Sequence, residues 1–353
     1  MERSLLHIIA SSLLTVVLCT FNSIRPSVPP AGTSNWVFFV RHLGLTFLCV
    51  IVPELTVTWA FKECLEVASL VTKFQISRAH AFMYHMGSFI SSANQEPLAR
   101  ITNTTALQIQ QVDVQQIVSQ NKAGVGPKLV TIAHVLYALA VFLARYARNL
   151  YITHMEIWSL SYVAVAIVLW VLWWPKPADV QYHIALAVPV SETFGASFST
   201  YSSLVKLLIG TKHLNERIPA EPEESHFSSR AFPTCGAPID IKVVWLANLV
   251  AMVLGSVHFL AWDTPFNSKL EEKIWRAATI TTTLLPVVFP VAVWFMHGLE
   301  RRAPPARVLE VLLWVLATVF VGGRLALLTL AFISLAELPA EAFVQMPWAR
   351  FGI

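Results

Sequence analysis

Long apolar runs separated by polar connections make up most of this chain. A helix needs about 20 apolar residues to cross the hydrocarbon core of a bilayer, and about seven runs approach that length. The runs are continuous and lack the alternation of apolar and polar residues typical of a membrane barrel strand. We therefore predict an all-α fold, a single polytopic bundle of about seven transmembrane helices: 5–21, 43–60, 129–143, 157–174, 243–262, 277–296 and 311–336.

Composition supports an integral, multi-pass membrane protein. Hydrophobic residues make up 56% of the chain and charged residues only 13%, whereas about a quarter of the residues in a soluble domain are charged. The net charge of +4 is spread among loops, so we expect no nucleic-acid partner. Membrane lipids and a hydrophobic small molecule are the expected partners. The placement of the four cysteines indicates neither a disulfide framework nor a thiolate metal site, and no cofactor is predicted.

Two long polar connections, 62–128 and 175–242, interrupt the runs. The first should continue the second helix as far as Lys73. In the second, residues 201–209 have the spacing of a helix that lies in the membrane interface. The first apolar run has the length of a signal peptide, but no small-residue cleavage site follows it cleanly, and we expect a retained helix.

The orientation in the membrane depends on which basic residues are counted. Lys and Arg in the short connections favour an N-terminus on the outer side, whereas the long loops favour the reverse. Because long loops are weak topological signals, we expect the N-terminus outside. The sequon Asn103, Thr104, Thr105 is then a glycosylation candidate.

Two apolar runs carry a charge near their middle. Glu54 follows Pro53 in the second run, and Arg324 stands in the last run. A charge at mid-membrane costs roughly 2.5 to 3.5 kcal/mol on insertion scales, so such residues usually face a protein interior and find a partner. Glu54 is either a general acid, a proton relay or an ion site, or a carboxyl that bonds backbone groups freed by the proline. Arg324 binds either an anionic headgroup or diphosphate, or Glu54 itself.

Histidines offer weaker signals. His80 and His85 stand five apart and so do not share a helical face, which disfavours a metal site; the aromatic residues around them favour a band at the membrane interface. His134 and His258 lie within apolar runs, where two histidines can clamp a haem. No pairing pattern supports a haem, and contacts between helices are the simpler interpretation.

The fourth apolar run has charged residues near both ends. Glu156 stands near its start, where a carboxylate complements the helix dipole. At its end, Trp173 and Trp174 are expected at the membrane surface, Pro175 stops the helix, and Lys176 should reach the headgroups. No Walker loop, GxSxG, HExxH or DDxxD pattern occurs, so the signatures of common NTPases, serine hydrolases, zinc proteases and metal-diphosphate enzymes are absent.

Taken together, separated pieces of the chain resemble an uncharacterised fungal family of polytopic membrane proteins with about seven helices and a WWxKPxDV-like box. The resemblance implies the fold and no activity. Ala81 and Ser88 stand where the family has glycines, and Phe21 replaces a tryptophan. The pieces are Leu18 to Thr20, Pro53, Glu54, His80 to Phe89, Arg145, Arg148, Glu156, Trp173 to Val180, His258, Trp262, Phe266, Glu271, Trp275, Arg276, Arg324, Leu338, Pro339 and Trp348.

Two functional hypotheses follow. The first is a membrane-embedded enzyme acting on a lipid or isoprenoid, motivated by ionisable residues at depth. The second is a non-catalytic transporter, receptor-like or scaffolding protein whose charges hold helices together; transport is disfavoured because no paired discontinuous segments occur in two similar halves. In the first hypothesis Glu54 and His258 are catalytic, and the ligand-binding candidates are Arg324, His80, Glu156 and Lys176.

Overall fold

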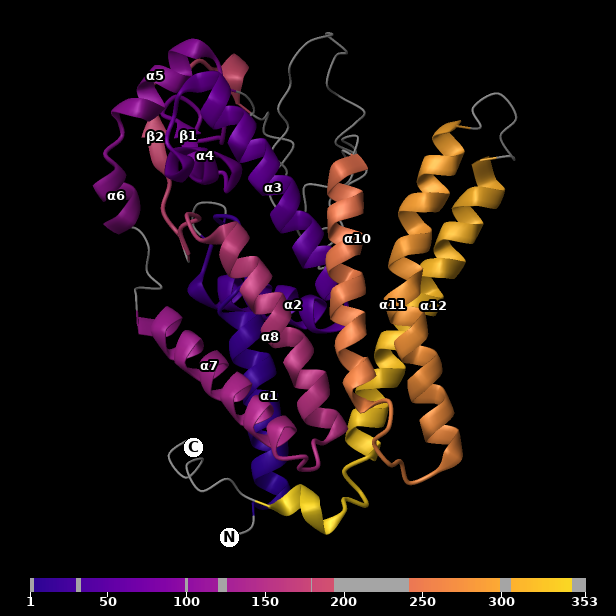
Figure 1. Cartoon of the computed structure of the whole chain (residues 1–353). Coiled ribbons are helices and arrows are strands. Elements are labelled where there is room, and N and C mark those ends of the chain that lie inside the picture. Colours follow the sequence, from indigo (N-terminus) through magenta and orange to yellow (C-terminus); the bar gives the residue numbers. More distant parts are fainter. Residues whose placement is uncertain are drawn as a thin grey trace.

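The structure, a computed structural model, is mostly helical (Figure 1). It describes residues 3–29, 33–98, 101–119, 126–178, 180–193, 241–298 and 306–344. Eight long helices form its body: α1 (Leu5–Phe21), α2 (Asn35–Ile51), α3 (Pro53–Phe74), α7 (Gly126–Ala147), α8 (His154–Trp173), α10 (Ile241–Ser256), α11 (Lys269–Gly298) and α12 (Ala306–Ile333). Two 3₁₀ helices extend this body, η4 (Val257–Ala261) and η5 (Ala340–Phe343).

Shorter elements gather at one end of the body into a unit that we call the cap, residues 78–98, 101–119 and 180–193 (Figure 1). Its two strands pair in parallel, with Phe89 opposite Ile184 and Ser91 opposite Leu186. The elements of the cap are α4 (Arg78–His85), β1 (Phe89–Ser91), α5 (Asn103–Gln111), α6 (Val114–Ser119), β2 (Ile184–Leu186) and η1 (Val190–Glu192).

The cap corrects two predictions. The prediction of an all-α fold is wrong at the small β1–β2 sheet, and much of the connection 62–128 is folded rather than a polar loop. Phe89 and Ile184 are buried with residues of α3, α4 and α8 in one apolar cluster, so this moderately polar sequence folds by extending the core of the helical body. The expected continuation of the second helix to Lys73 is confirmed by α3. The predicted interfacial helix at 201–209 lies outside the described residues.

Three helices are long and apolar enough to cross a membrane: Lys128–Ala147, His154–Trp173 and Trp314–Ile333. A fourth crossing follows if α2 and α3 together form one bent span. The prediction of seven spans is therefore wrong for the part of the chain that the structure describes. The first run forms a helix of only 17 residues, and the fifth changes to a 3₁₀ helix after Ser256. Apolar runs alone do not distinguish such shorter helices, which can pack within a protein, from helices that cross a bilayer.

A sharp bend divides the predicted span 43–60. Helix α2 ends at Ile51, α3 begins at Pro53, and their axes differ by 111°. Proline lacks the N–H needed to continue a helix but fits the first helical position, where that N–H has no partner in the helix. The single predicted helix is thus two helices, and the break places Glu54 in the first turn of α3.

Close packing joins α10, α11 and α12, which lie side by side in Figure 1. A Cβ atom added to Gly255 in α10 would lie 2.7 Å from the backbone oxygen of Thr282 in α11. A Cβ on Gly323 in α12 would lie 3.2 Å from the Thr282 methyl group. Small residues therefore let the three helices approach one another, as is common between membrane helices.

We expect Gly255→Ala to destabilise the protein by about 1 to 3 kcal/mol, because the new methyl group meets backbone atoms that no rotamer change can move. Gly322→Ala is the matched control, since no atom lies within 4 Å of its Cβ position and alanine favours a helix more than glycine does. Thermal unfolding in detergent, followed by tryptophan fluorescence, measures both. Equal melting temperatures for the two variants would contradict the packing described here.

Candidate functional site

Glu54 and Arg324, the two charges expected at mid-membrane, are each other's partners. The Arg324 Nη2 group donates a hydrogen bond to Glu54 Oε1, which joins the first turn of α3 to α12. The two residues are 8% and 7% exposed, and the Arg324 guanidinium carbon lies 5.7 Å from the centre of the Phe320 ring. Among the described residues, Glu54 Oε2 and Arg324 Nε have no hydrogen-bond partner. The pair is thus held by one hydrogen bond rather than by a two-pronged contact.

His258 lies in η4, where the α10 segment passes toward α11. Its Nδ1 is 3.2 Å from the carbonyl oxygen of Gly255, so Nδ1 carries the proton and donates it. Its Nε2 is buried and has no hydrogen-bond partner in the described part of the chain. The Trp275 indole N–H donates to the His258 carbonyl at 3.4 Å. No hydrogen bond or ion pair among described residues joins His258 to Glu54 or Arg324, so direct contact does not assemble the predicted catalytic set.

A second buried histidine, His154, begins α8 and faces the same tryptophan. Its ring centre is 4.9 Å from that of Trp275 and 4.1 Å from that of Phe266. The Thr264 hydroxyl donates to the Ala261 carbonyl at 2.8 Å and therefore accepts from His154 Nε2, also at 2.8 Å. The two histidines and the aromatic rings join α8, η4 and α11.

His80 lies inside the cap, and both of its ring nitrogens have partners. Nε2 donates to the Val112 carbonyl oxygen at 2.9 Å, so Nδ1 accepts from the Ser77 hydroxyl at 2.8 Å. The predicted interfacial band is wrong here, because Phe82 and Tyr84 are each only 2% exposed. Burial raises the pKa of the Tyr84 hydroxyl. This histidine stretch therefore forms part of the core of the cap.

Lys176 is enclosed by a carboxylate and two tryptophans. Its Nζ donates to Glu63 Oε2 at 2.7 Å, and the Trp173 indole N–H donates to the same oxygen at 2.8 Å. The ammonium lies 4.4 Å from the centre of the Trp173 ring and 4.8 Å from that of Trp59, within range of cation–π attraction. Trp174 points outward and is 65% exposed. Of the two tryptophans expected at the surface, only the second is exposed.

The prediction that Lys176 reaches the headgroups is wrong, because the residue is 1% exposed. Burial lowers the pKa of its ammonium, and the Glu63 carboxylate acts against that shift. Glu63 was not among the predicted site residues. It stands one helical turn after Trp59 on α3, so the two share a face. A carboxylate and a tryptophan at this spacing were the signal in the sequence, but only the fold brings Lys176 to them.

Glu156 and Arg3 together join three segments of the chain. Its carboxylate accepts from the Thr153 backbone N–H at 2.9 Å in a capping box, and it accepts from both terminal nitrogens of Arg3. The Arg3 Nε donates to the Ala342 carbonyl at 2.5 Å, and the Arg3 backbone N–H donates to the Phe343 carbonyl at 2.7 Å. Arg3 and the η5 segment therefore meet at the start of α8, at the end of the body opposite the cap (Figure 1).

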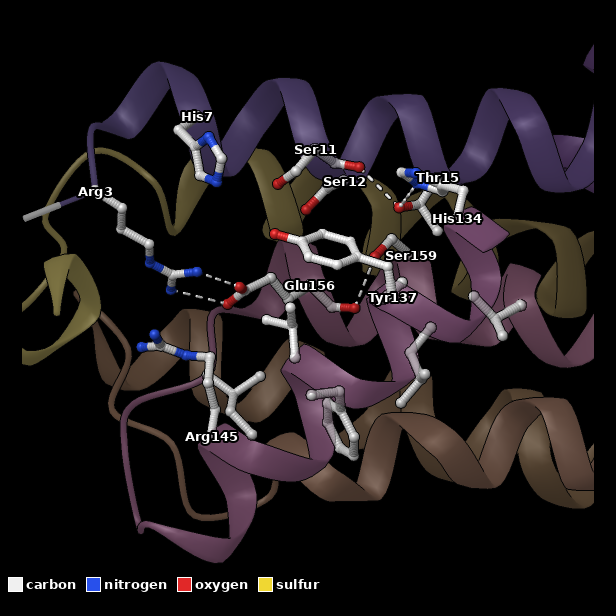
Figure 2. Close-up of a pocket in the computed structure, with 16 residues that line it drawn as sticks. Arg3, His7, Ser11, Ser12, Thr15, His134, Tyr137, Arg145, Glu156 and Ser159 are labelled. Carbon is white, nitrogen blue, oxygen red and sulfur yellow. Dashed lines mark hydrogen bonds and ion pairs between the residues drawn. The ribbon is translucent and has the colours of Figure 1, made fainter. Parts of the chain in front are cut away.

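A cavity of about 70 Å³ lies among α1, α7 and α8, next to this junction (Figure 2). Polar side chains from all three helices line it, including Ser12 and Thr15 of α1, His134 and Tyr137 of α7, and Ser159 of α8. Of the predicted site residues, Glu156 alone lines this cavity. Hydroxyl residues three or four apart in the first apolar run were the available signal, because that spacing places them on one helical face.

Asn103 is exposed in the first turn of α5. The third residue of its sequon, Thr105, is 1% exposed, and its hydroxyl donates to the Glu192 carboxylate. Glycosylation of Asn103 stays a prediction.

Comparison with known proteins adds one match. Residues 104–207 match a family described as "Family of unknown function (DUF8562)". The match covers less than a third of the chain and includes α7, α8, Glu156 and Lys176. No curated protein and no solved structure matches the chain. The chain is thus similar in part to an uncharacterised family, and the broader resemblance to fungal seven-helix proteins stays a prediction.

We expect Lys176→Met to cost about 3 to 5 kcal/mol of stability, because it leaves the buried Glu63 carboxylate without its cation. The double variant Glu63→Gln with Lys176→Met should recover much of that loss. Lys73→Met, which changes an exposed lysine of α3, should stay within about 0.5 kcal/mol of the parent. The melting temperature in detergent measures all three variants. A double variant no more stable than Lys176→Met would show that the Glu63–Lys176 ion pair does not stabilise the fold.

Proposed function

We propose that this protein is a non-catalytic membrane protein, receptor-like or scaffolding, in which intramembrane charges hold helices together. The Glu54–Arg324 pair is the observation that carries the proposal. An arginine within a membrane helix needs an anionic or polar partner, and here the partner is the residue predicted to be the acid. This contact between α3 and α12 accounts for both charges, and it needs no reaction to explain them.

Three of the other predicted site residues support the same conclusion. Glu156 is bound to Arg3, Lys176 to Glu63, and the ring nitrogens of His80 to Ser77 and Val112. The three ion pairs join residues separated by 270, 153 and 113 positions in the sequence. Side chains that link distant segments in this way act as clamps between elements, and none of these contacts leaves a charged group directed toward a substrate.

The cap supports the receptor-like or scaffolding role. Its buried apolar residues continue the core of the helical body, and it lies at one end of the apolar helices (Figure 1). Its outer positions include exposed polar residues of α5 and α6, such as Gln111 and Gln115. A folded unit carried on membrane-anchored helices presents a fixed surface for recognition and needs no reacting group.

An enzyme acting on a lipid or isoprenoid is the second candidate. One observation favours it: Glu54 Oε2 and His258 Nε2 are buried polar atoms with no hydrogen-bond partner among the described residues. Buried polar atoms without partners are uncommon, and catalysis is one of the reasons for keeping them. In this candidate Glu54 and His258 would act on a substrate whose anionic or polar group binds Arg324.

A double-mutant cycle tests the proposed function. We expect Arg324→Leu and Glu54→Gln each to reduce stability, the arginine variant by about 3 to 5 kcal/mol, because each leaves its partner buried without an opposite charge. Glu54→Gln combined with Arg324→Leu should be milder than the sum of the single losses. Folded yield after detergent extraction and melting temperature provide the measurement. Additive losses of stability would show that the Glu54 and Arg324 side chains do not stabilise each other.

The same variants separate the two candidates. Lipid and metabolite extracts are compared between host cells carrying the wild type, Glu54→Gln, or no copy of the gene. A structural role predicts that Glu54→Gln lowers the amount of folded protein, with any change in extracts following that amount. A fully folded Glu54→Gln protein that abolishes a lipid product made with the wild type would establish the enzyme and overturn the proposal.

A further inference from the structure

The cavity among α1, α7 and α8 contains a buried hydroxyl without a partner. Ser12 is 2% exposed, lines the cavity, and its Oγ has no hydrogen-bond partner among the described residues. Figure 2 shows this side chain directed from α1 into the space that faces Tyr137 of α7 and Glu156 of α8. A buried hydroxyl without a partner costs free energy, so a ligand group that bonds Ser12 would remove that cost.

Two neighbouring hydroxyls, those of Ser11 and Ser159, offer acceptors rather than donors. Ser11 donates to the Ile8 carbonyl at 3.1 Å, and Ser159 donates to the Glu156 carbonyl at 2.8 Å. Each hydroxyl oxygen still has lone pairs after its proton is used. Ser12 can donate, and its neighbours can accept. The group that best matches such a wall is one that both accepts and donates, which an alcohol does and a carboxylate does not.

The charges at one end of the cavity are already engaged by the protein. Arg3 and Glu156 bind each other. Arg145 donates to the Tyr151 carbonyl at 3.1 and 2.5 Å and to the Val344 carbonyl at 2.8 Å. These contacts favour an uncharged head group. The two arginines and the one carboxylate leave a net charge of one positive unit at this end. A long-chain carboxylate is therefore the alternative ligand that an experiment has to distinguish from an alcohol.

The size and surroundings of the cavity fit a head group attached to an apolar body. A volume of about 70 Å³ has room for a few water-sized groups, which suits a head group, and it is too small for a whole lipid. Phe142 and Leu160 supply part of an apolar wall. The lining also includes Ala138, Val141, Ile152 and Val163. An apolar body attached to the head group therefore contacts apolar side chains at the cavity itself.

We infer that this cavity binds the hydroxyl group of an uncharged, hydroxylated lipid, either a sterol or an acyclic long-chain alcohol. Ser12 donates to the ligand oxygen, and the ligand hydroxyl donates to the oxygen of Ser11 or Ser159. The apolar body of the ligand leaves the cavity along its apolar wall, which includes Phe142 of α7 and Leu160 of α8. This inference goes beyond the proposed function and does not depend on the Glu54–Arg324 pair, so either can fail without the other.

Photolabelling of the full-length protein in detergent tests the inference. The probes are a photoreactive, alkyne-tagged sterol, a photoreactive, alkyne-tagged hexadecanol, and the matching hexadecanoic acid. We expect saturable labelling by at least one of the alcohols, mapped by mass spectrometry to peptides of α1, α7 or α8, and weaker labelling by the acid. Stronger labelling by the sterol or by the hexadecanol shows whether the apolar body of the ligand is a fused-ring system or a linear chain. Labelling by the acid that equals or exceeds that of both alcohols would overturn the assignment.

Two variants and a control connect the labelling to the cavity. Ser12→Ala removes one hydrogen bond and should weaken alcohol binding roughly fivefold. Ala138→Leu adds bulk to the lining and should weaken it at least as much. Ser161→Ala is the control, because Ser161 is a buried serine of α8 outside the cavity lining whose hydroxyl donates to the Trp158 carbonyl. Unchanged labelling in both cavity variants, with melting temperatures like the parent, would refute the site.

Discussion

The need to partner every buried charge is the constraint on which this structure depends. In an apolar surrounding a single ionised side chain is unfavourable by several kcal/mol, and the chain places such groups in several helices. The fold meets the constraint by pairing Glu54 with Arg324, and Glu63 with Lys176. Each pair fixes the relative position of two helices, because moving either helix would separate the charges. The arrangement of α3 against both α8 and α12 follows from this requirement.

The same constraint explains which parts of the site could be predicted. The charge of Arg324 cannot be neutralised, so its need for a partner was visible in the sequence, and Glu54 was the natural candidate. Lys176 was misassigned for a related reason. After an apolar run that ends in tryptophans, a lysine normally extends to the headgroups. Only the packing of the end of α8 against α3 brings Glu63 and Trp59 around this lysine. No pattern within the α8 sequence predicts that packing.

The fold itself was predicted in outline only. Apolar runs identified helices correctly at α1, α7, α8 and α12, because continuous apolar sequence of this length favours a helix in any setting. Pro53 marked a bend, and it proved to be a break of 111°. The cap was missed because its buried apolar residues lie in short stretches of sequence. Residues such as Phe89 and Ile184 are far apart in the chain and pair only in three dimensions. The number of spans was overestimated because hydropathy reports burial in protein and burial in lipid alike.

The junction at Arg3 has a consequence for biosynthesis. The ribosome makes Arg3 long before it makes Phe343, whose carbonyl accepts a hydrogen bond from the Arg3 backbone N–H. Until then, α1 and α8 can associate through Glu156, but the ring of contacts at this end stays open. Closure of this end of the bundle therefore waits until Phe343 has been made, and a nascent protein stalled shortly before Ala342 would present an incomplete end to the quality-control machinery of the cell.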